Sequence, residues 1–162
     1  MMSLRTLIPA LQLSVRAAVA AGVAAMAAQA LGLDFPVYAM IAAVIVTDLS
    51  PARTRELALP RLAGTVLGGA VGAALASNGW HGPFAVAPGI LMAMLLAQPA
   101  RPPDAGRLAG YVCAIVVLDH HVAPWSYALY RCLETLLGIG VAVVVSLVPK
   151  IIPEHRTTGP RT

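Results

Sequence analysis

The sequence predicts an all-α, polytopic membrane protein with six transmembrane helices arranged as two inverted three-helix repeats. Three observations lead to this prediction: the composition is strongly apolar, one helical motif occurs twice, and the positive charges fall on one side of the predicted spans. Of the 162 residues, 59% are hydrophobic and only 11% are charged. An ordinary soluble domain has about 25% charged residues, so these few charges cannot cover a globule of this size in water.

The repeated motif divides the chain into two halves. An Arg-x-x-x-Thr-x-Leu-Gly run begins at Arg61 and returns at Arg131, 70 residues later. Upstream of it, the apolar segment 43–48 matches 114–119, and both segments end in Asp. Internal repeats of this kind define structural units. We therefore expect one transmembrane domain over 1–150, with repeat halves of about 11–80 and 83–149, and a short polar cytoplasmic tail over 151–162.

The first half contains three predicted spans. Residues 11–32 form the first, because this apolar run is close to a full crossing, although its start resembles a signal peptide. Residues 37–49 form the second, which is short, since a helix needs about 20 residues to cross a bilayer. The third helix should start at Pro51 with Ser50 as its cap. Pro60 should bend or interrupt this helix before the third span begins.

The third span covers 61–77, and three more follow in the second half. Pro88-Gly89 should break the fourth span, and the Arg101-Pro102-Pro103-Asp104 segment should be a loop that no helix passes through. The fourth, fifth and sixth spans are predicted at 83–98, 106–119 and 126–148.

The positive charges predict the orientation. With the N-terminus in the cytoplasm, ten positive side chains face the cytoplasm and Arg131 alone falls on the outer half. The sequence thus predicts a plasma (inner) membrane protein with both termini cytoplasmic. Since each half has an odd number of spans, the second half is inverted, a pattern typical of secondary transporters. The ten are Arg5, Arg16, Arg53, Arg55, Arg61, Arg101, Arg107, Lys150, Arg156 and Arg161.

Arg61 and Arg131 are the leading candidates for substrate contact. The repeat places one toward each end of the membrane, as a pseudo-symmetric pair of cations. An arginine within a span is costly and often functional, so Arg131 either contacts an anion or pairs with Glu134, three residues on. Glu134 is either a proton-coupling group or the partner that neutralises Arg131, and the second interpretation is favoured.

Threonine and tyrosine side chains complete the candidate site. Thr65 and Thr135 lie one turn from the arginines and either bind a carboxylate ligand or bond to backbone carbonyls. Tyr38 belongs with Trp125, Tyr127 and Tyr130 to an interfacial aromatic belt, or stacks on an aromatic substrate. Gly64, Gly68 and Gly72, echoed by Gly138, Ala142 and Ser146, form ridges suited to close helix packing.

Other classes of function find no support. Asp119-His120-His121 resembles a fragment of a metal site, but no companion ligands occur at the right spacing. Cys113 and Cys132 lie inside apolar segments and fit reduced, packed thiols. We find no nucleophile motif, phosphate loop or cofactor fingerprint, so we predict no enzyme and no cofactor. Dispersed positive charges also argue against nucleic-acid binding.

Several of these motifs together resemble the fusaric acid resistance and aromatic acid exporter family. They are Pro36-x-Tyr38-Ala, Arg61-x-x-Gly64-Thr65-x-x-Gly68 and the closing Arg131-x-x-x-Thr135-x-x-Gly138, and the likeness covers most of 11–149. The resemblance implies an inner-membrane exporter of aromatic or other organic acids. Relatives usually carry a sizeable cytoplasmic domain and often a second six-span bundle. This chain has neither, which implies a homodimer.

The expected function is export of small organic anions through the lipid bilayer. Arg61 and Arg131 would bind the substrate carboxylate, and Thr65 and Thr135 would supply hydrogen bonds. The alternatives are a passive organic-anion channel, in which the same arginines line a continuous path, and a non-transporting membrane scaffold subunit.

Overall fold

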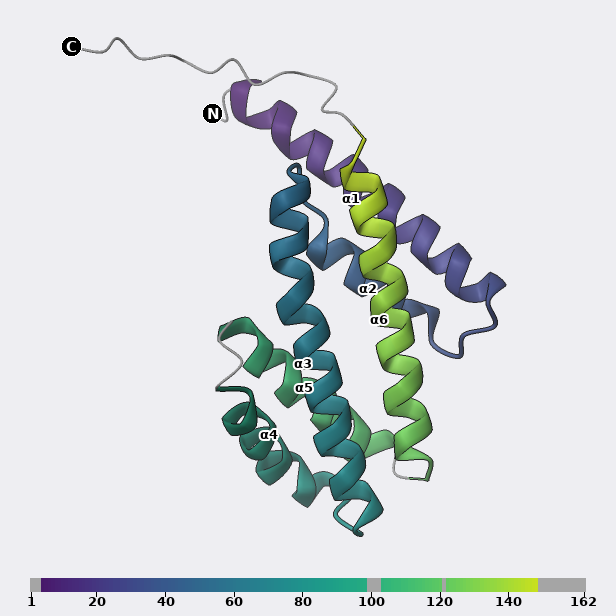
Figure 1. The fold of residues 1–162 in the computed structure, drawn as a ribbon, viewed down its shortest axis with the longest axis vertical. Helices are drawn as coiled ribbons and strands as arrows, with labels where there is room; N and C mark the ends of the chain where they lie inside the picture. The colour runs from purple at the N-terminus through teal and green to yellow at the C-terminus, as the bar shows by residue number, and fades with distance from the viewer. Residues whose placement is uncertain (1–3, 99–102, 121, 149–162) are drawn as a thin grey trace, which may run out of the picture.

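The computed structural model describes residues 4–98, 103–120 and 122–148, and every regular element in these ranges is an α-helix. The prediction of an all-α fold is confirmed. Figure 1 shows how the helices are arranged. The six helices are α1 (Leu4–Ala30), α2 (Pro36–Val46), α3 (Pro51–Ser77), α4 (Pro83–Ala97), α5 (Pro103–Asp119) and α6 (Pro124–Ser146).

Proline starts five of these helices, as its missing N–H and fixed φ favour at the first helical position. Pro51 was predicted there, but the predicted cap by Ser50 is wrong, since its side chain makes no capping hydrogen bond. Instead, Asp48 Oδ1 accepts a hydrogen bond from Ser50 N at 3.0 Å, and Asp48 N donates to Thr54 Oγ1 at 3.1 Å. The turn before α3 is therefore held by Asp48 and Thr54.

The predicted break at Pro88 is wrong, and Pro60 does not interrupt its helix. Pro60 lies inside α3 and Pro88 inside α4, and both helices continue through them. Proline is tolerated within membrane helices where neighbouring helices support the freed backbone groups. The start of the fifth helix was also placed too late, because α5 begins at Pro103, with Asp104 in its first turn near the positive end of the helix dipole. Arg101 and Pro102 lie outside the described residues.

The long helices α3 and α6 lie side by side and run in opposite directions at the centre of the fold (Figure 1). The short helix α2 packs mainly on α6, and α5 packs mainly on α3. α1 covers α2 and α6, while α4 covers α5. The second helix of each half thus packs against the third helix of the other half, so the two halves interlock.

Glycines allow these helices to approach closely. A Cβ added to Gly68 of α3 would overlap the backbone of Ala109 in α5, and one added to Gly138 of α6 would overlap the backbone of Ala39 in α2. Gly64 and Gly72 are equally crowded by α5. The predicted role of the glycine ridges in close packing is confirmed at these positions. Gly68 and Ala109 are 41 positions apart in the sequence, and Ala39 and Gly138 are 99 apart. Both contacts nevertheless join helices of opposite halves.

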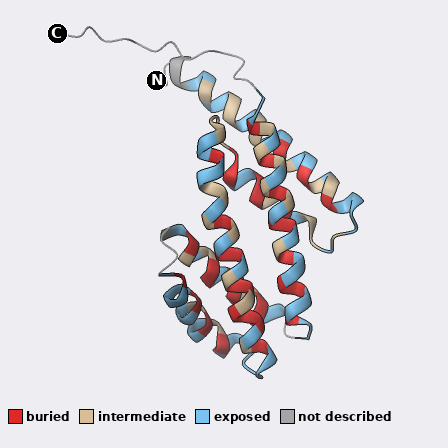
Figure 2. Cartoon of the chain, viewed as in Figure 1, coloured by how far each residue is buried: buried red, intermediate tan, exposed pale blue. Residues whose placement is uncertain are grey.

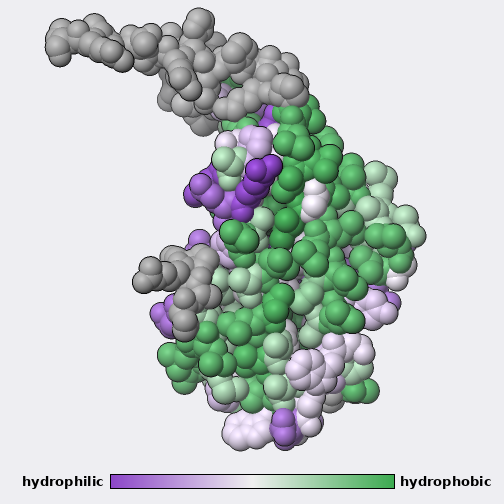
Figure 3. Space-filling view, viewed as in Figure 1, coloured by the Kyte–Doolittle hydropathy of each residue, from purple (hydrophilic) through white to green (hydrophobic). Residues whose placement is uncertain are grey.

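The outer surface is apolar, as a bilayer requires. Buried residues follow the facing sides of α3, α5 and α6 (Figure 2), and hydrophobic side chains cover most of the visible face, with hydrophilic ones near the start of α3 (Figure 3). Within the described ranges, three helices are long and apolar enough to cross a membrane: Leu7–Ala30, Pro51–Ser77 and Pro124–Ser146. The helices Pro36–Val46 and Pro83–Ala97 are apolar but shorter.

Arg16 ties three segments together at one end of the fold. Its Nη1 donates to the Leu49 carbonyl at 3.3 Å, and its Nη2 donates to the Val148 carbonyl. Leu49 lies between α2 and α3, and Val148 follows α6. One side chain of α1 therefore satisfies backbone carbonyls that follow two other helices.

Candidate functional site

Two arginines are among the most buried side chains of the protein. The exposed fraction is 1% for Arg61 of α3 and 2% for Arg131 of α6. Glu134 and Thr135 are fully buried on α6 as well. A buried charge is costly unless it has partners, so the contacts of these groups decide whether they are structural or functional.

Arg131 is held by aromatic rings. Its guanidinium carbon lies 3.2 Å from the centre of the Tyr38 ring and 5.9 Å from that of Tyr111. Its Nη2 donates to the Tyr111 hydroxyl over 3.5 Å. The other donors, Nε and Nη1, are buried and have no hydrogen-bond partner. The ring faces stabilise the positive charge and leave two donors available for a ligand.

Arg61 approaches the same tyrosine. Its guanidinium carbon lies 5.8 Å from the centre of the Tyr111 ring, and its Nε and Nη2 atoms also lack partners. Given the distance of 5.9 Å from Arg131 to that ring, the two guanidinium carbons are no more than about 12 Å apart. The hydrocarbon core of a bilayer is about 30 Å thick. The expectation of one arginine at each end of the membrane is therefore wrong, and both belong to one cluster.

Among the described residues, Glu134 forms no ion pair with Arg131 within 4 Å, so the predicted pairing is not found. The ion pair found among the described residues joins Arg53 and Glu56 on the surface of α3, at 3.0 Å. Glu134 Oε1 instead accepts a hydrogen bond of 2.7 Å from the backbone N–H of Phe35, just before α2. Carboxylates are favoured at a helix N-terminus, where N–H groups are free. This attraction directs Glu134 toward α2, while its Oε2 atom keeps no partner.

The two threonines of the motif differ. Thr65 Oγ1 donates to the Arg61 carbonyl at 2.9 Å, within its own helix. Thr135 Oγ1 is buried and has no partner. Bonding to the backbone is therefore correct for Thr65, whereas the Thr135 hydroxyl remains available to a ligand.

Tyr38 lies in a cluster of four rings, formed by Phe35, Tyr38, His120 and Tyr127, which we call the aromatic cluster. The Tyr127 hydroxyl donates to the Tyr38 hydroxyl at 3.0 Å, and the His120 ring stacks on Tyr127 with ring centres 3.6 Å apart. Phe35 meets the other three rings with ring centres 5.4–5.9 Å apart. Tyr127 is 4% exposed, so its assignment to the interfacial belt is wrong. It forms part of the wall beside Arg131.

A pocket of about 270 Å³ lies beside the aromatic cluster. Phe35, His120 and Tyr127 line it together with Asp34, Asp119 and Tyr130. Three rings of the aromatic cluster thus line this pocket, and the fourth, Tyr38, contacts the guanidinium of Arg131. We call the pocket that Asp34 and Asp119 line the acidic pocket.

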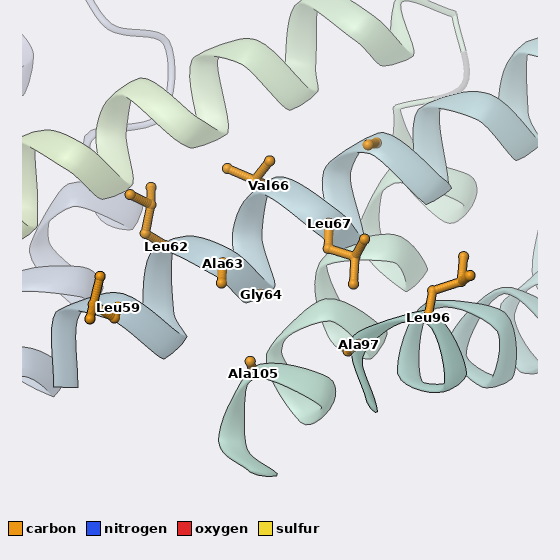
Figure 4. A pocket seen from close by; sticks show the side chains of 10 residues that line it. Leu59, Leu62, Ala63, Gly64, Val66, Leu67, Leu96, Ala97 and Ala105 are labelled. Atoms are coloured by element: carbon orange, nitrogen blue, oxygen red, sulfur yellow. The ribbon is translucent and has the colours of Figure 1, made fainter. Parts of the chain in front are cut away.

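A second hollow of about 690 Å³ lies between α3 and the neighbouring ends of α4 and α5 (Figure 4). Its lining contains aliphatic and small side chains such as Leu59, Leu96 and Ala105, and no polar side chain among the described residues. Such a surface suits apolar chains and offers nothing to a carboxylate. The candidate site is therefore the group of Arg61, Arg131, Glu134, Thr135, Tyr38 and Tyr111, which we call the arginine site.

Sequence reasoning missed Tyr111 of α5, which joins the two arginines. The sequence does indicate that Tyr111 is unusual, since it places a hydroxyl in the otherwise apolar run 108–118. It also missed the Phe35 backbone N–H, the partner of Glu134. No sequence pattern shows that contact, because the two residues are 99 positions apart.

Comparison with known proteins identifies the family. The pattern of the family described as "Fusaric acid resistance protein-like" matches residues 23–145, about three quarters of the chain. No curated protein and no solved structure matches the chain significantly. The family consists of membrane transport proteins rather than enzymes. The resemblance seen in the sequence motifs is thus confirmed, and the chain belongs to the fusaric acid resistance protein-like family.

Proposed function

We propose that the protein exports small aromatic organic acids across the inner membrane and works as a homodimer. The observation that carries this proposal is the pair of buried arginines around Tyr111, each with two unpartnered donors. Arginine suits carboxylates because its planar fork donates two parallel hydrogen bonds. An anion is the ligand that would satisfy these donors and offset the buried charge.

The residues of the arginine site have distinct roles in this proposal. Arg131 and Arg61 bind the substrate carboxylate, and the free Thr135 hydroxyl donates to it. Tyr38 and Tyr111 position the guanidinium groups and offer ring faces to an aromatic substrate. Thr65, whose hydroxyl is bonded to the Arg61 carbonyl, acts by fixing the helix that carries Arg61.

We also propose six spans in two inverted repeats, with both termini in the cytoplasm. The paired contacts Gly68–Ala109 and Gly138–Ala39 support the repeat, because positions 70 residues apart meet partners that are also 70 residues apart. Arg16, Arg53 and Arg55 lie on α1 and the start of α3, which supports a cytoplasmic location for that end. Reporter fusions in the 77–83 loop test this topology, since a cytoplasmic signal there would contradict it.

Efflux of labelled benzoate from proteoliposomes tests the transport proposal, with wild type beside Arg131→Gln. We expect efflux in the wild type and at least about a tenfold loss in the variant, since one charged hydrogen-bonding partner contributes about 1.5–3 kcal/mol. Arg53→Gln is the matched control, because Arg53 is exposed on α3 and should leave efflux unchanged. Equal efflux from wild type and Arg131→Gln would contradict the assignment of the site.

Two further measurements address coupling and assembly. Movement of benzoate against its gradient, driven by a proton gradient, supports an exporter, whereas strictly downhill flux would favour a channel. The mass of the detergent-solubilised protein checks the homodimer. A monomer that transports at full rate would contradict it.

A further inference from the structure

Glu134 is a buried acid that anion binding does not itself require. It is 0% exposed and lies on α6, one turn from Arg131. The equivalent position in the first half is Gly64, which packs against Ala105 of α5. The other half of the repeat thus forms its helix contact without a carboxylate, so the acid at position 134 calls for a separate explanation.

The contacts of Glu134 leave one oxygen unused. Oε1 accepts the Phe35 N–H, whereas Oε2 is buried without a hydrogen-bond partner. An unpartnered carboxylate oxygen away from water is costly. Binding a proton at Oε2 removes the negative charge and keeps the bond from Phe35 to Oε1. Glu134 can therefore bind a proton and keep its hydrogen bond from Phe35.

The surroundings of Glu134 are rich in titratable groups. Arg131 and Tyr127 approach it from α6 and Asp34 from the α1–α2 connection. Tyr38 of α2, Arg61 of α3 and Tyr111 of α5 belong to the same cluster through their contacts with Arg131 and with one another. His120 contacts the Phe35 and Tyr127 rings. The charges that act most directly on a substrate anion are those of Arg131, Arg61 and Glu134.

We propose that Glu134 binds a proton when the arginine site binds an organic anion, so that each event strengthens the other. This inference rests on the proposed function. An ionised Glu134 opposes the field of Arg131 and repels a second carboxylate. A neutral Glu134 leaves the charge of the arginines to the substrate. At equilibrium, one proton from water therefore resides on Glu134 Oε2 while one organic anion occupies the arginine site.

The acidic pocket gives the proton an approach. Asp34, Asp119 and His120 line that pocket, and Phe35, whose N–H binds Glu134, forms part of its wall. The pocket therefore lies beside the residue whose backbone N–H binds the Glu134 carboxylate. Because linkage is reciprocal, whatever favours the proton on Glu134 also favours the anion on the arginines.

Equilibrium binding of labelled benzoate to the purified full chain in lipid nanodiscs tests this inference. Benzoate stays ionised between about pH 5.5 and about pH 8, so a change in its affinity reports on the protein. We expect about tenfold tighter binding by the wild type at the lower pH, within the range of about 5–150-fold typical of coupled sites. Glu134→Gln, which imitates the neutral acid, should bind tightly at both values.

Two controls separate Glu134 from other titrating groups. Glu56→Gln changes an acid that is exposed on α3 and should retain the dependence of the wild type. His120→Gln changes the imidazole that lines the acidic pocket, and it should also retain that dependence. Loss of the pH dependence in His120→Gln but not in Glu134→Gln would overturn the proposal.

The remaining outcomes distinguish this inference from the proposed function. Binding that requires Arg131 but has the same affinity at both pH values would overturn the role of Glu134 and leave the transport proposal intact. Absence of benzoate binding by the wild type at either pH would overturn both. If Glu134→Gln fails to fold, the wild type and His120→Gln decide, because equal wild-type affinity at both pH values, or loss of the pH dependence in His120→Gln, would overturn the proposal.

Discussion

The guanidinium carbon of Arg131 lies 3.2 Å from the centre of the Tyr38 ring, which joins α6 to α2 inside the fold. Tyr38 is fixed in turn by the hydroxyl of Tyr127. A buried cation that rests on a ring face keeps its edge donors free, because the ring occupies the face of the guanidinium plane and accepts no edge hydrogen bond. This contact explains how Arg131 is both stabilised and available to an anion.

Replacement of Tyr38 by Leu should therefore lower the free energy of unfolding by about 2 kcal/mol, the size of a desolvated cation–π contact. Tyr38→Phe keeps the ring and removes only the bond to Tyr127, so its loss should be about 1 kcal/mol. Unfolding by a denaturing detergent in mixed micelles measures both. Equal losses for Leu and Phe would show that the hydroxyl, rather than the ring, holds Arg131.

The close approach of α6 to α2 gives a second prediction. Gly138→Ala places a Cβ against the Ala39 backbone and should destabilise the protein by about 1–3 kcal/mol, as overpacking does. Gly140→Ala is the matched control, since nothing lies within 4 Å of the added Cβ only two residues further along α6. Comparable melting temperatures for the two variants would contradict the packing described for Gly138.

The contrast between these glycines also shows what could be predicted from the sequence. Periodicity and the repeat indicated the helices and the ridges that contain Gly64, Gly68 and Gly138, because close packing selects small residues at fixed spacing. The continuation of α3 through Pro60 and of α4 through Pro88 could not be predicted, since it depends on neighbouring helices. The hydrogen-bond partner of Glu134 could not be predicted. The spacing of charges along α6 favours Arg131, whereas the fold brings the Phe35 N–H to the carboxylate.

Arg16 gives a third prediction, which concerns assembly of the helix ends. Arg16→Ala removes the donors to the Leu49 and Val148 carbonyls and should cost about 2 kcal/mol, since two hydrogen bonds outside the core contribute about 0.5–1.5 kcal/mol each. Arg53→Ala removes a surface pair with Glu56 and should cost about 0.5 kcal/mol or less. Unfolding in mixed micelles measures both, and an equal effect would contradict the structural role of Arg16.

The two motif threonines give the sharpest test of the arginine site, because the same substitution should act in opposite ways. Thr135→Val replaces a buried, unpartnered hydroxyl by a methyl group of similar size. It should raise the free energy of unfolding of the anion-free protein by about 1 kcal/mol, since an unsatisfied polar group is removed. It should also weaken benzoate binding up to about tenfold, through loss of one hydrogen bond to the carboxylate.

Thr65→Val is the counterpart in the other half of the repeat. The Thr65 hydroxyl is bonded to the Arg61 carbonyl, so its removal should lower stability slightly and leave benzoate affinity within about twofold of the wild type. Unfolding in mixed micelles and equilibrium binding of benzoate on the same two samples check these outcomes. A loss of affinity in Thr65→Val with none in Thr135→Val would reverse the assignment, because it would place the ligand beside α3 rather than beside Glu134 and Arg131 on α6.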